Sequence, residues 1–487
     1  MSSWLVALFN GSLESASFPS IWKCALIRPL SKIRTPLSPS DTRPIANLPE
    51  LSKLLERVVA EQIMSYLNKY DLLDPRQSAY RSGYSTQSAL LRVCDDIREG
   101  IDDRLATIMV LFDFSKAFDT VPHLRLLVKL KCLGFSDVVL CWFFHYLTGR
   151  SQAVVDDEGG CSGWLSTSLG VPQGSVLDPL LFSLFINDIS DALSNSKHML
   201  FADDLQIYLS CPPAEILQGL RLISQDVHAI FEYAGANGLK LNLEKSKVII
   251  FSGQAYASSI DVSRLPPVTV GMTSLPFVSE VRNLGITLMS DLSWKRHVLH
   301  VSQCVHRALY MLKFNKNSLS EKLRIKLVVT LILPHIDYCS LVYHGLSSEL
   351  NVRLQRLVNC CVRFIFNLRR DEHITPFRRR LGWVSVENRR LFFLGCQIYR
   401  ILYMTSPSYL HELFIPSDPT LRRSERSLHP SSQTFHIPSH RTATYKNSFR
   451  LSSIYFWHSL PDHITSAPSL ATFKNLLRSF LIASEFA

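Results

Sequence analysis

The chain has 487 residues, of which 47% are hydrophobic, so it is long enough for one elaborated enzyme, and its composition excludes an intrinsically disordered protein. Its apolar runs are shorter than the roughly 18 residues that span a bilayer, and its N-terminus lacks the basic start and apolar stretch of a signal peptide. The 11 cysteines include no Cys-x-x-Cys pair, which argues against a zinc knuckle and favours reduced thiols in an intracellular protein.

The net charge of +11 is unevenly distributed. Residues 351–450 contain 17 Lys and Arg against 6 Asp and Glu, and the rest of the chain is balanced. A basic region beside a neutral body favours a polyanionic partner, most often nucleic acid. A basic surface without a ligand fits the charge equally well.

The first half of the chain alternates between helical and strand patterns. Residues 29–50 contain five prolines, which predict an irregular loop. The apolar run of residues 105–113 ends on Asp113 and is typical of a buried strand. Apolar residues at helical spacing predict helices over residues 51–69, 122–132, 136–148 and 217–236.

A turn and a capped helix are predicted next. Residues 170–176 read "GVPQGSV", which is a Gly/Pro turn. Residues 178–193 follow with a helical pattern, in which Asp178 suits the N-cap and Pro179 the first helical position.

The second half begins with strands and continues with helices. Residues 198–210 predict two strands joined by a turn at "ADD", and residues 239–253 and 281–289 predict further strands. From about residue 295 the pattern is mostly helical. Residues 415–445 are rich in Ser, Pro, Arg and His and predict a loop or mobile linker.

Two adjacent acids, Asp203 and Asp204, interrupt the apolar run "HMLFADDLQIYLS". Carboxylates are costly to bury unless a cation lies beside them. If the strand that ends at Asp113 lies beside this run, the carboxylates converge at one sheet edge and provide the hard oxygen ligands that suit Mg²⁺. Two such ions about 4 Å apart promote in-line phosphoryl transfer. The alternative is an exposed turn acid and a helix cap.

The order of these segments resembles a known family. The series "FDFSKAFDTV", "GVPQGSVLDPLLFSLFINDI", "FADDLQIY", "NGLKLNLEKSKVIIF" and "VRNLGITLMSDLSW" is similar to the consecutive palm motifs of reverse transcriptases. Upstream, "WKCALIRPLSKIR", "DTRPIANLPELSKLLERVV" and "RQSAYRSGYSTQSALL" resemble the fingers motifs of that family. The sequences of these motifs are most similar to those of the non-LTR (LINE-type, jockey-like) retrotransposon enzymes, and the tail "SFRLSSIYFWHSLPDHITSAPSLATFKNLL" resembles that of the same group.

The resemblance implies roles for single residues. Asp113, Asp203 and Asp204 match the metal-binding acids, and Phe118 matches the bulky position that excludes a ribose 2′-OH; a core aromatic is the alternative for Phe118. Gln173 and Gly174 match the turn that packs against the nucleotide and template, where glycine lets the backbone approach a base. Three cations complete the match: Lys32 and Arg43 for the triphosphate, and Lys245 as the acid that protonates pyrophosphate, with Lys247 as its alternative. Asp119 is not a matched ligand and is interpreted as the N-cap of the following helix.

The resemblance also implies an α+β right-hand polymerase fold. Its parts would be fingers and palm (residues 1–290), a helical thumb (residues 291–370) and a basic C-terminal region (residues 371–487). The expected enzyme is an RNA-directed DNA polymerase, with an RNA template, a DNA primer, dNTPs and two Mg²⁺ ions that Mn²⁺ could replace. We expect it in the cytoplasm and nucleus, with no membrane partner.

Two departures from the family pattern qualify this expectation. The family usually has Gly-Pro where this chain has Asp178-Pro179, and a negative charge there would weaken triphosphate binding by repulsion. No upstream endonuclease segment is present in the sequence, so an N-terminally truncated element is expected. A catalytically inactive remnant that only binds nucleic acid is the first alternative function, and a DNA-templated polymerase is the second.

Overall fold

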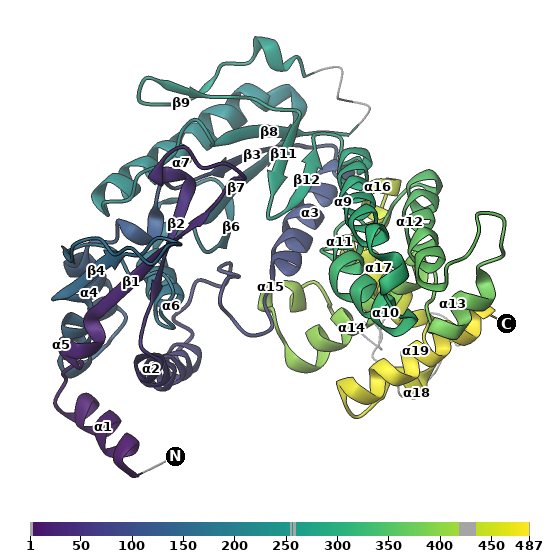
Figure 1. Cartoon of the computed structure of the whole chain (residues 1–487). Coiled ribbons are helices and arrows are strands. Elements are labelled where there is room, and N and C mark those ends of the chain that lie inside the picture. Colours follow the sequence, from purple (N-terminus) through teal and green to yellow (C-terminus); the bar gives the residue numbers. More distant parts are fainter. Residues whose placement is uncertain (1–2, 254–255, 257–259, 418–434, 487) are drawn as a thin grey trace.

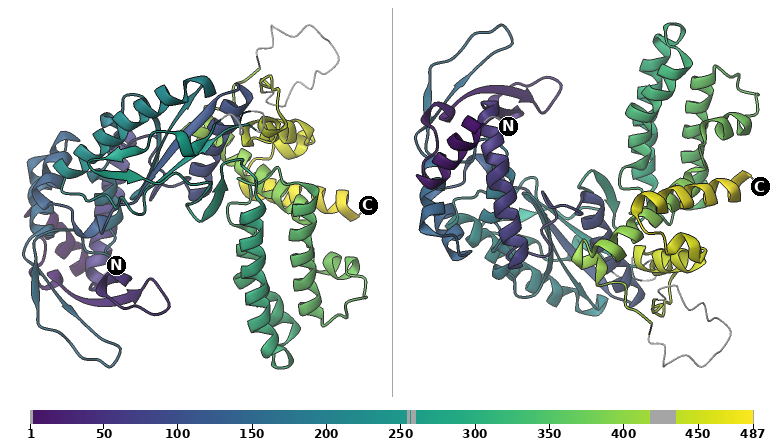
Figure 2. Two further views of the ribbon diagram at one scale, coloured as in Figure 1. Left: turned by 90° about the horizontal axis from the view of Figure 1, so that it is seen from above. Right: turned by 90° about the horizontal axis from the view of Figure 1, so that it is seen from below.

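The computed structural model describes residues 3–253, 256, 260–417 and 435–486. In Figure 1 the N-terminal segments lie on the left, a four-stranded sheet crosses the centre, and the helices that follow residue 295 lie on the right. Both views of Figure 2 show a pair of long helices, α9 and α12, projecting away from the sheet. The expected α+β fold with a helical C-terminal part is confirmed.

The central sheet has the strand order β6-β7-β3-β8, and its neighbours are antiparallel. Its strands are β3 (Ala106–Phe112), β6 (Lys197–Phe201), β7 (Asp204–Cys211) and β8 (Lys247–Phe251). Side chains of β3 alternate between two cores, with Met109 in one and Ile108 and Val110 in the other. Because both faces are covered, β3 is an almost unbroken apolar run, as the sequence of residues 105–113 predicts.

An outer sheet has the order β2-β1-β4-β5. Its strands are β1 (Cys24–Ser31), β2 (Thr42–Asn47), β4 (Arg150–Val154) and β5 (Leu165–Thr167). The expectation of an irregular loop over residues 29–50 is therefore wrong for residues 29–31 and 42–47, which are strand, and holds for most of the segment between them. Pro29 lies opposite Pro44, in the part of β1 that pairs only with the edge strand β2, so neither ring removes a hydrogen bond from a central position.

The helices of the first half pack on these sheets. They are α1 (Ser3–Glu14), α2 (Glu50–Lys69), α3 (Thr86–Asp102), α4 (His123–Cys132), α5 (Asp137–Leu147), α6 (Asp178–Phe185) and α7 (Ile216–Ala236). The four helices predicted from periodicity are confirmed as α2, α4, α5 and α7. The predicted helix over residues 178–193 is shorter, since α6 ends at Phe185.

The expected cap of α6 is also wrong. Asp178 is the first residue of α6 and Leu177 occupies the N-cap position, so the Asp178 carboxyl caps nothing. Its own backbone N–H instead donates to Ser175 Oγ at 2.9 Å.

Two further hairpins follow α7. The first is β9 (Val268–Val270) with β10 (Thr273–Leu275), and the second is β11 (Glu280–Asn283) with β12 (Ile286–Met289). The predicted strand over residues 281–289 is thus a hairpin, and the strand-rich segment 239–253 supplies only β8.

The remaining helices follow residue 294, and most of them share one core with the α3 face of the central sheet. They are α9 (Lys295–Phe314), α10 (Glu321–Leu327), α11 (Leu333–Asp337), α12 (Ser348–Phe366), α13 (Thr375–Leu381), α14 (Val386–Met404), α15 (Ser408–His411), α16 (Ala443–Lys446), α17 (Phe449–Ser459), α18 (Asp462–Thr465) and α19 (Leu470–Phe486). Met109 of β3 belongs to the same core as Phe449 and Phe473, so the C-terminal part closes over the sheet.

Two carboxylates of α3 hold this closure. Asp95 accepts hydrogen bonds from the backbone N–H groups of Phe449 (2.7 Å) and Arg450 (2.8 Å), at the start of α17. Asp102 accepts from the backbone N–H groups of Arg441 (3.0 Å) and Thr442 (2.6 Å), just before α16. Asp95 therefore satisfies the first backbone N–H groups of α17, whereas Asp102 ties the segment before α16 to α3, and α16 is capped by its own Thr442. Most of the loop predicted at residues 415–445 lies outside the described residues.

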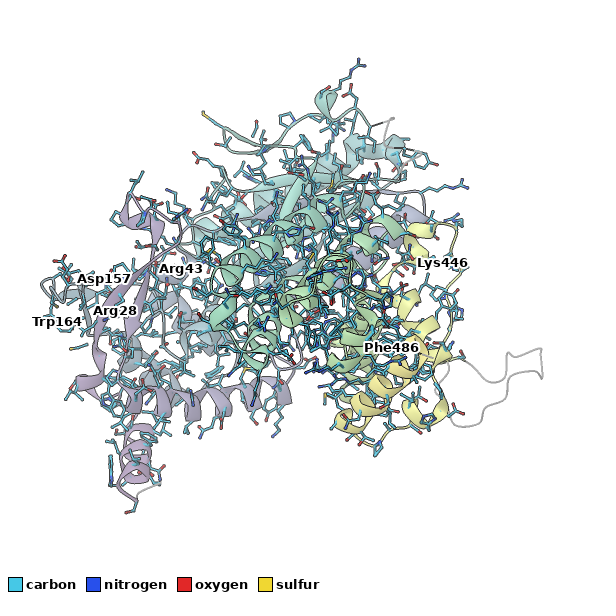
Figure 3. All side chains as sticks on the ribbon, turned by 45° about the vertical axis from the view of Figure 1, so that its right-hand side comes forward. Arg28, Arg43, Asp157, Trp164, Lys446 and Phe486 are labelled. Carbon is cyan, nitrogen blue, oxygen red and sulfur yellow. The ribbon has the colours of Figure 1, made fainter. Side chains whose placement is uncertain are left out.

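Side chains cover the ribbon on all sides in Figure 3. Arg28 and Arg43 lie on the outer sheet, Asp157 and Trp164 lie in the loop that joins β4 to β5, and Lys446 and Phe486 lie on the C-terminal helices. Each of the 11 cysteines lies within the described residues as a free thiol. No helix in the described part of the chain has the length and apolar character to cross a membrane.

Candidate active site

The β6–β7 hairpin presents the two adjacent acids on different sides. Phe201 pairs with Asp204, so Ala202 and Asp203 form a two-residue turn in which Ala202 has the left-handed φ of 54°. The backbone N–H of Ala202 donates to Gln77 Oε1 at 3.1 Å, which helps to hold that conformation. Asp203 lines a large cavity, whereas Asp204 lines a small one of about 110 Å³.

Asp113 lies directly after β3 and lines both cavities. Phe112 pairs with Leu205, so the end of β3 lies beside the start of β7, where Asp204 stands. The Asp113 backbone is tied to the loop before β8: its N–H donates to Ser246 Oγ (3.3 Å), and its carbonyl accepts from the Asn242 N–H (2.7 Å). The predicted convergence of Asp113 with the hairpin acids is therefore present.

The three carboxylates perturb one another. Burial, together with the negative charge of Asp113, raises the pKa of Asp203 above its usual value, while Arg43 opposes the shift. Burial by the surrounding chain, and then the charges of Asp203 and Asp113, raises the pKa of Asp204 to about 6, although part of this side chain reaches solvent. Such crowding of negative charge is relieved by a bound cation.

The large cavity has a volume of about 1230 Å³ and brings together residues from both sheets. Seven of the residues matched to site roles in the sequence line it: Lys32, Arg43, Asp113, Phe118, Gln173, Asp203 and Lys245. Asp204 and Gly174 are not among its lining residues. Tyr80, Lys116 and Asn242 also line it and were missed, although Tyr80 lies in the quoted "RQSAYRSG" motif and Lys116 in "FDFSKAFD".

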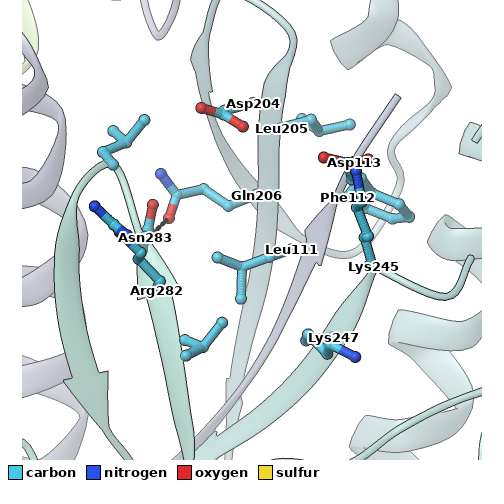
Figure 4. A pocket seen from close by; sticks show the side chains of 12 residues that line it. Leu111, Phe112, Asp113, Asp204, Leu205, Gln206, Lys245, Lys247, Arg282 and Asn283 are labelled. Atoms are coloured by element: carbon cyan, nitrogen blue, oxygen red, sulfur yellow. Dashed lines mark hydrogen bonds and ion pairs between the residues drawn. The ribbon is translucent and has the colours of Figure 1, made fainter. Parts of the chain in front are cut away.

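The candidate cations occupy distinct places. Lys245 Nζ lies 3.9 Å from Asp113 Oδ2, and Figure 4 shows the two side chains beside each other. Lys247 Nζ instead donates to the Glu244 carbonyl at 2.9 Å and lines only the small cavity. Lys32 and Arg43 come from the β1–β2 arm, where the Lys32 backbone N–H donates to the Asp41 carbonyl at 2.7 Å. This geometry favours Lys245 over Lys247 at the large cavity.

The bulky residue Phe118 forms part of the cavity wall and of the core beneath it. Its ring stacks on Phe182 of α6 with centroids 4.2 Å apart and planes at 29°. Phe118 is therefore a half-buried side chain that lines the cavity and also packs on the core, and the stack on Phe182 fixes its position.

The turn at residues 172–174 is held by neighbours that the sequence did not indicate. Gln173 Nε2 donates to Asp119 Oδ1 at 2.7 Å. The interpretation of Asp119 as a helix cap is wrong, because α4 begins at His123 after Pro122. Gly174 has a φ of 108°, and a Cβ there would lie 2.7 Å from the Ala46 carbonyl oxygen. The close approach that requires glycine is thus to strand β2.

Asp178 stands beside this turn but is not among the residues that line the large cavity. Its side chain is only 6% exposed, and Oδ1 has no hydrogen-bond partner among the described residues. Burial, with the nearby charges of Asp119 and Glu56, raises the pKa of Asp178 to about 8. The carboxyl is therefore mostly protonated at pH 7, and the expected repulsion of a triphosphate by a negative charge at residue 178 does not hold at that pH.

The donor set fits a divalent cation by its chemistry. Within the described ranges, no group of three His, Cys, Asp or Glu side chains is arranged to hold a metal ion directly. Asp113 and Asp203 nevertheless line one cavity and repel each other, and their carboxylate oxygens are the hard donors that Mg²⁺ prefers.

Comparisons with known proteins define the class. The family model described as reverse transcriptase (RNA-dependent DNA polymerase) matches residues 31–288, which is more than half of the chain. The chain therefore belongs to the reverse transcriptase family, whose mixed α/β polymerase fold it has. Membership implies use of a divalent metal and of a nucleic-acid template and primer.

The relatives are enzymes of mobile elements. In Drosophila melanogaster, the probable RNA-directed DNA polymerase from transposon X-element is 27% identical (74% of this chain, 40% of that protein). The RNA-directed DNA polymerase from mobile element jockey is 25% identical (73% and 39%), and the probable enzyme from transposon BS is 28% identical (79% and 43%). The expected likeness to jockey-like non-LTR retrotransposon enzymes is confirmed. The chain spans about two fifths of the length of these relatives.

Among solved structures, the chain resembles telomerases. One is telomerase from Candida albicans in complex with a TWJ fragment of telomeric RNA, with a TM-score of 0.39 and 12% identity (83% of this chain, 63% of that chain). Another is apo telomerase from Candida tropicalis, with a TM-score of 0.40 and 12% identity (80% and 69%).

Proposed function

We propose that this chain is an RNA-directed DNA polymerase of a mobile element, which joins dNTPs to a primer 3′-OH on an RNA template. The observation that carries the proposal is the convergence of Lys32, Arg43, Phe118 and Gln173 on the cavity that Asp113 and Asp203 line. These residues come from segments that are up to 171 positions apart in the sequence, and the chemistry of each suits one part of a nucleotide.

Asp113 and Asp203 would hold Mg²⁺, or Mn²⁺ in its place, with Asp204 in support from the adjoining cavity. A pair of such ions supplies neutralising charge to the attacking and leaving oxygens of an in-line phosphoryl transfer. The carboxylates themselves would hold the ions in place at the end of β3. Asp113 and Asp203 are both half-exposed, so the site is open to solvent and to substrate.

The remaining residues would bind and orient the dNTP. Lys32 and Arg43 supply a point charge and a bidentate fork for the triphosphate. Lys245, beside Asp113, is positioned to give a proton to the departing pyrophosphate. The Phe118 ring occupies the space that a ribose 2′-OH would need, and Gln173 offers an amide to the base pair being formed.

The division into parts follows the same proposal. Residues 1–290 would be the fingers and palm, residues 291–370 the thumb, and residues 371–487 the basic C-terminal region. The α9–α12 pair beside the central sheet suits a thumb that contacts the template–primer duplex. The C-terminal region would act with it, since both share the core that covers α3.

Primer extension on an RNA template tests the function. Asp113→Asn and Asp203→Asn should each lower kcat by about 10³-fold or more, whereas Asp204→Asn should lower it about 10- to 100-fold, as for residues that support metal ligands. Asp157→Asn, in the exposed β4–β5 loop, is the matched control and should extend normally.

Template binding and a second template separate the alternatives. Retained RNA affinity in the inactive variants would place their defect in catalysis. A wild-type chain that binds RNA but extends no primer would support the binding-only remnant. Equal extension on DNA and RNA templates would support a DNA-templated polymerase instead.

A further inference from the structure

The segment after Phe118 is bonded to the turn that carries Gln173. The Gly170 N–H donates to the Val121 carbonyl (2.8 Å), and the Val171 N–H donates to the Phe118 carbonyl (3.0 Å). His123 Nε2 adds a hydrogen bond to the Gly170 carbonyl at 2.8 Å. These bonds fix the start of the turn relative to the wall that Phe118 forms.

The end of the turn is bonded to the strand that carries Arg43. The Ala46 N–H donates to the Gln173 carbonyl at 2.7 Å. Gln173 therefore joins the arm that holds the triphosphate candidates to the segment that holds the gate candidate. Its backbone is fixed on one side by β2, and its side chain reaches the other side, where it meets Asp119.

A carboxylate constrains the Gln173 amide in a specific way. An ionised carboxylate only accepts hydrogen bonds, so the Gln173 NH₂ group must face Asp119, and Oε1 must face away from it. Without this partner the amide could turn over, because its two ends have nearly the same shape. Asp119 thereby determines that the acceptor end of the Gln173 amide, Oε1, faces away from Asp119.

The orientation of the Gln173 amide matters because the residue lines two cavities. Asp119 and Gln173 both line the large cavity, and both also line a second cavity of about 280 Å³ on the other side of the turn. Their hydrogen bond is part of the wall between the two cavities. Loss of the bond would free the Gln173 amide to rotate toward either side, without removing any residue proposed to bind metal or triphosphate.

We propose that Asp119 is a positioning residue that acts through Gln173 to orient its amide toward the incoming dNTP. This inference rests on the proposed polymerase function and adds a residue to it. Asp119 itself makes no contact with substrate in this scheme. Its effect is on nucleotide binding and on the choice between matched and mismatched dNTPs, and chemistry at the α-phosphate is left unchanged.

A double-mutant cycle tests the coupling. Asp119→Ala should raise the KM for a matched dNTP about tenfold and leave kcat within about twofold, because one orienting bond is lost while the carboxylate site is kept. Gln173→Ala should have a similar effect, and Asp119→Ala in the Gln173→Ala background should add less than about twofold. Full additivity of the two changes, or a fall in kcat with an unchanged KM, would overturn the proposal.

Two further variants separate orientation from a structural role. Asp119→Asn keeps the size of the side chain but can donate as well as accept, so it no longer fixes the orientation of the Gln173 amide and should raise the KM nearly as much as Asp119→Ala does. An Asn variant with the KM of the wild-type chain would refute orientation by an acceptor-only carboxylate. Thr120→Ala is the matched control in the same segment, because its hydroxyl donates to the Lys116 and Ala117 carbonyls within that segment. It should leave both parameters unchanged.

A binding measurement keeps this proposal apart from the proposed function. On a primer that ends in a dideoxynucleotide, the Kd of the next matched dNTP can be measured without turnover. A tenfold weaker Kd for Asp119→Ala supports the positioning role, even if the wild-type chain extends no primer and the polymerase proposal fails. An unchanged Kd, or no dNTP binding by the wild-type chain, refutes it.

Discussion

At the scale of single residues, neighbours in sequence have different roles because a strand alternates its faces. Asp203 lies in the turn and faces the large cavity, whereas Asp204, the first residue of β7, faces the small one. Of the three acids, Asp113 alone lines both cavities, as Lys245 also does. This asymmetry is why we expect Asp203→Asn to be more damaging than Asp204→Asn, although both acids belong to one sequence pair.

The buried acid Asp178 makes stability depend on pH. In the unfolded chain an aspartate loses its proton near pH 4, whereas burial and nearby acids keep Asp178 protonated up to about pH 8 in the folded protein. The folded state then binds more protons between these values, so the free energy of unfolding falls as the pH rises through this window.

Asp178→Asn should therefore stabilise the protein, and the gain should grow from pH 5 to pH 8, reaching on the order of 2 kcal/mol. Denaturant unfolding at several pH values measures it. Asp157→Asn, at an exposed position, should show no such trend. A gain that is constant with pH would mean that the Asn side chain, and not the removal of a titrating group, is responsible.

Phe118 offers a prediction on sugar selection. Phe118→Ala should raise the kcat/KM for an rNTP relative to its dNTP about 10- to 100-fold, because space for a 2′-OH opens in the cavity wall. Steady-state incorporation of both nucleotides gives the ratio. Phe182→Leu removes the ring on which Phe118 stacks but leaves the Phe118 ring in the cavity wall, so it should raise the ratio less than Phe118→Ala does. A similar change in both variants would argue against a steric gate.

At the scale of elements, α3 joins the central sheet to the C-terminal helices through its acids. Asp102 accepts from the Arg441 N–H, the Thr442 N–H and the Thr442 hydroxyl, and its side chain is buried. The next residue, Asp103, makes only an exposed ion pair with Arg441 at 3.1 Å. Asp102 thus satisfies backbone donors, and Asp103, which makes an exposed ion pair with the same segment, is a matched control for its charge.

Asp102→Ala should lower the free energy of unfolding by about 1–2 kcal/mol, because two backbone N–H groups lose their acceptor. Asp103→Ala should cost less than about 0.5 kcal/mol, as exposed ion pairs contribute little. Denaturant unfolding compares the two, and amide hydrogen exchange at Arg441 and Thr442 reports the loss of the acceptor directly. Equal losses for both variants would show that charge near α16, and not these hydrogen bonds, matters.

The sequence predicts elements where one local signal dominates. The period of α2, α4, α5 and α7, and the apolar run of β3, are such signals. Strands β1 and β2 were missed because prolines argue against strands unless one knows that their positions face no central partner. The roles of Asp119 and Asp178 were missed for a related reason: each depends on Gln173 or on burial by distant chain, which no local pattern records.

Most residues of the candidate site were indicated by the sequence, but the choice between two neighbouring lysines was not. The order of motifs indicated Asp113, Asp203 and the residues that converge with them, since a series of segments carries more information than any one of them. The pattern did not separate Lys245 from Lys247, which are two positions apart in one charged stretch. Their difference appears only in space, where one lies beside Asp113 and the other bonds to a backbone carbonyl.

At the scale of the whole molecule, ion pairs within the chain neutralise part of the positive charge of residues 351–450. Arg378 pairs with Glu485, Arg380 with Glu321 and Arg389 with Asp337. Arg353 and Arg356, on the exposed side of α12, make no ion pair with any described residue. Deleting residues 351–487 to test RNA binding would remove much of the shared core as well as the basic residues. Point substitutions are therefore the better test.

Arg353→Gln and Arg356→Gln should each weaken RNA binding and reduce the slope of log Kd against log salt by about 1, because each lost phosphate contact releases one counterion fewer. Arg380→Gln, whose guanidinium lies 2.6 Å from Glu321, should leave the slope unchanged. Titrations of a labelled single-stranded RNA at several salt concentrations measure this. An equal reduction in all three variants would mean that net charge, and not place, governs binding.

The hydrogen bonds between α3 and the C-terminal segments also have a consequence in time. Asp102 lies 339 and 340 positions before Arg441 and Thr442, and Asp95 lies 354 positions before Phe449. At a synthesis rate of about 5–20 residues per second, these acids wait roughly 20–70 s for their partners. Until then, the core that covers α3 lacks Phe449, Phe473 and its other members from α17 to α19. A nascent chain stalled before Arg441 should therefore be cut by protease at α3 more readily than one that has been synthesised to residue 486.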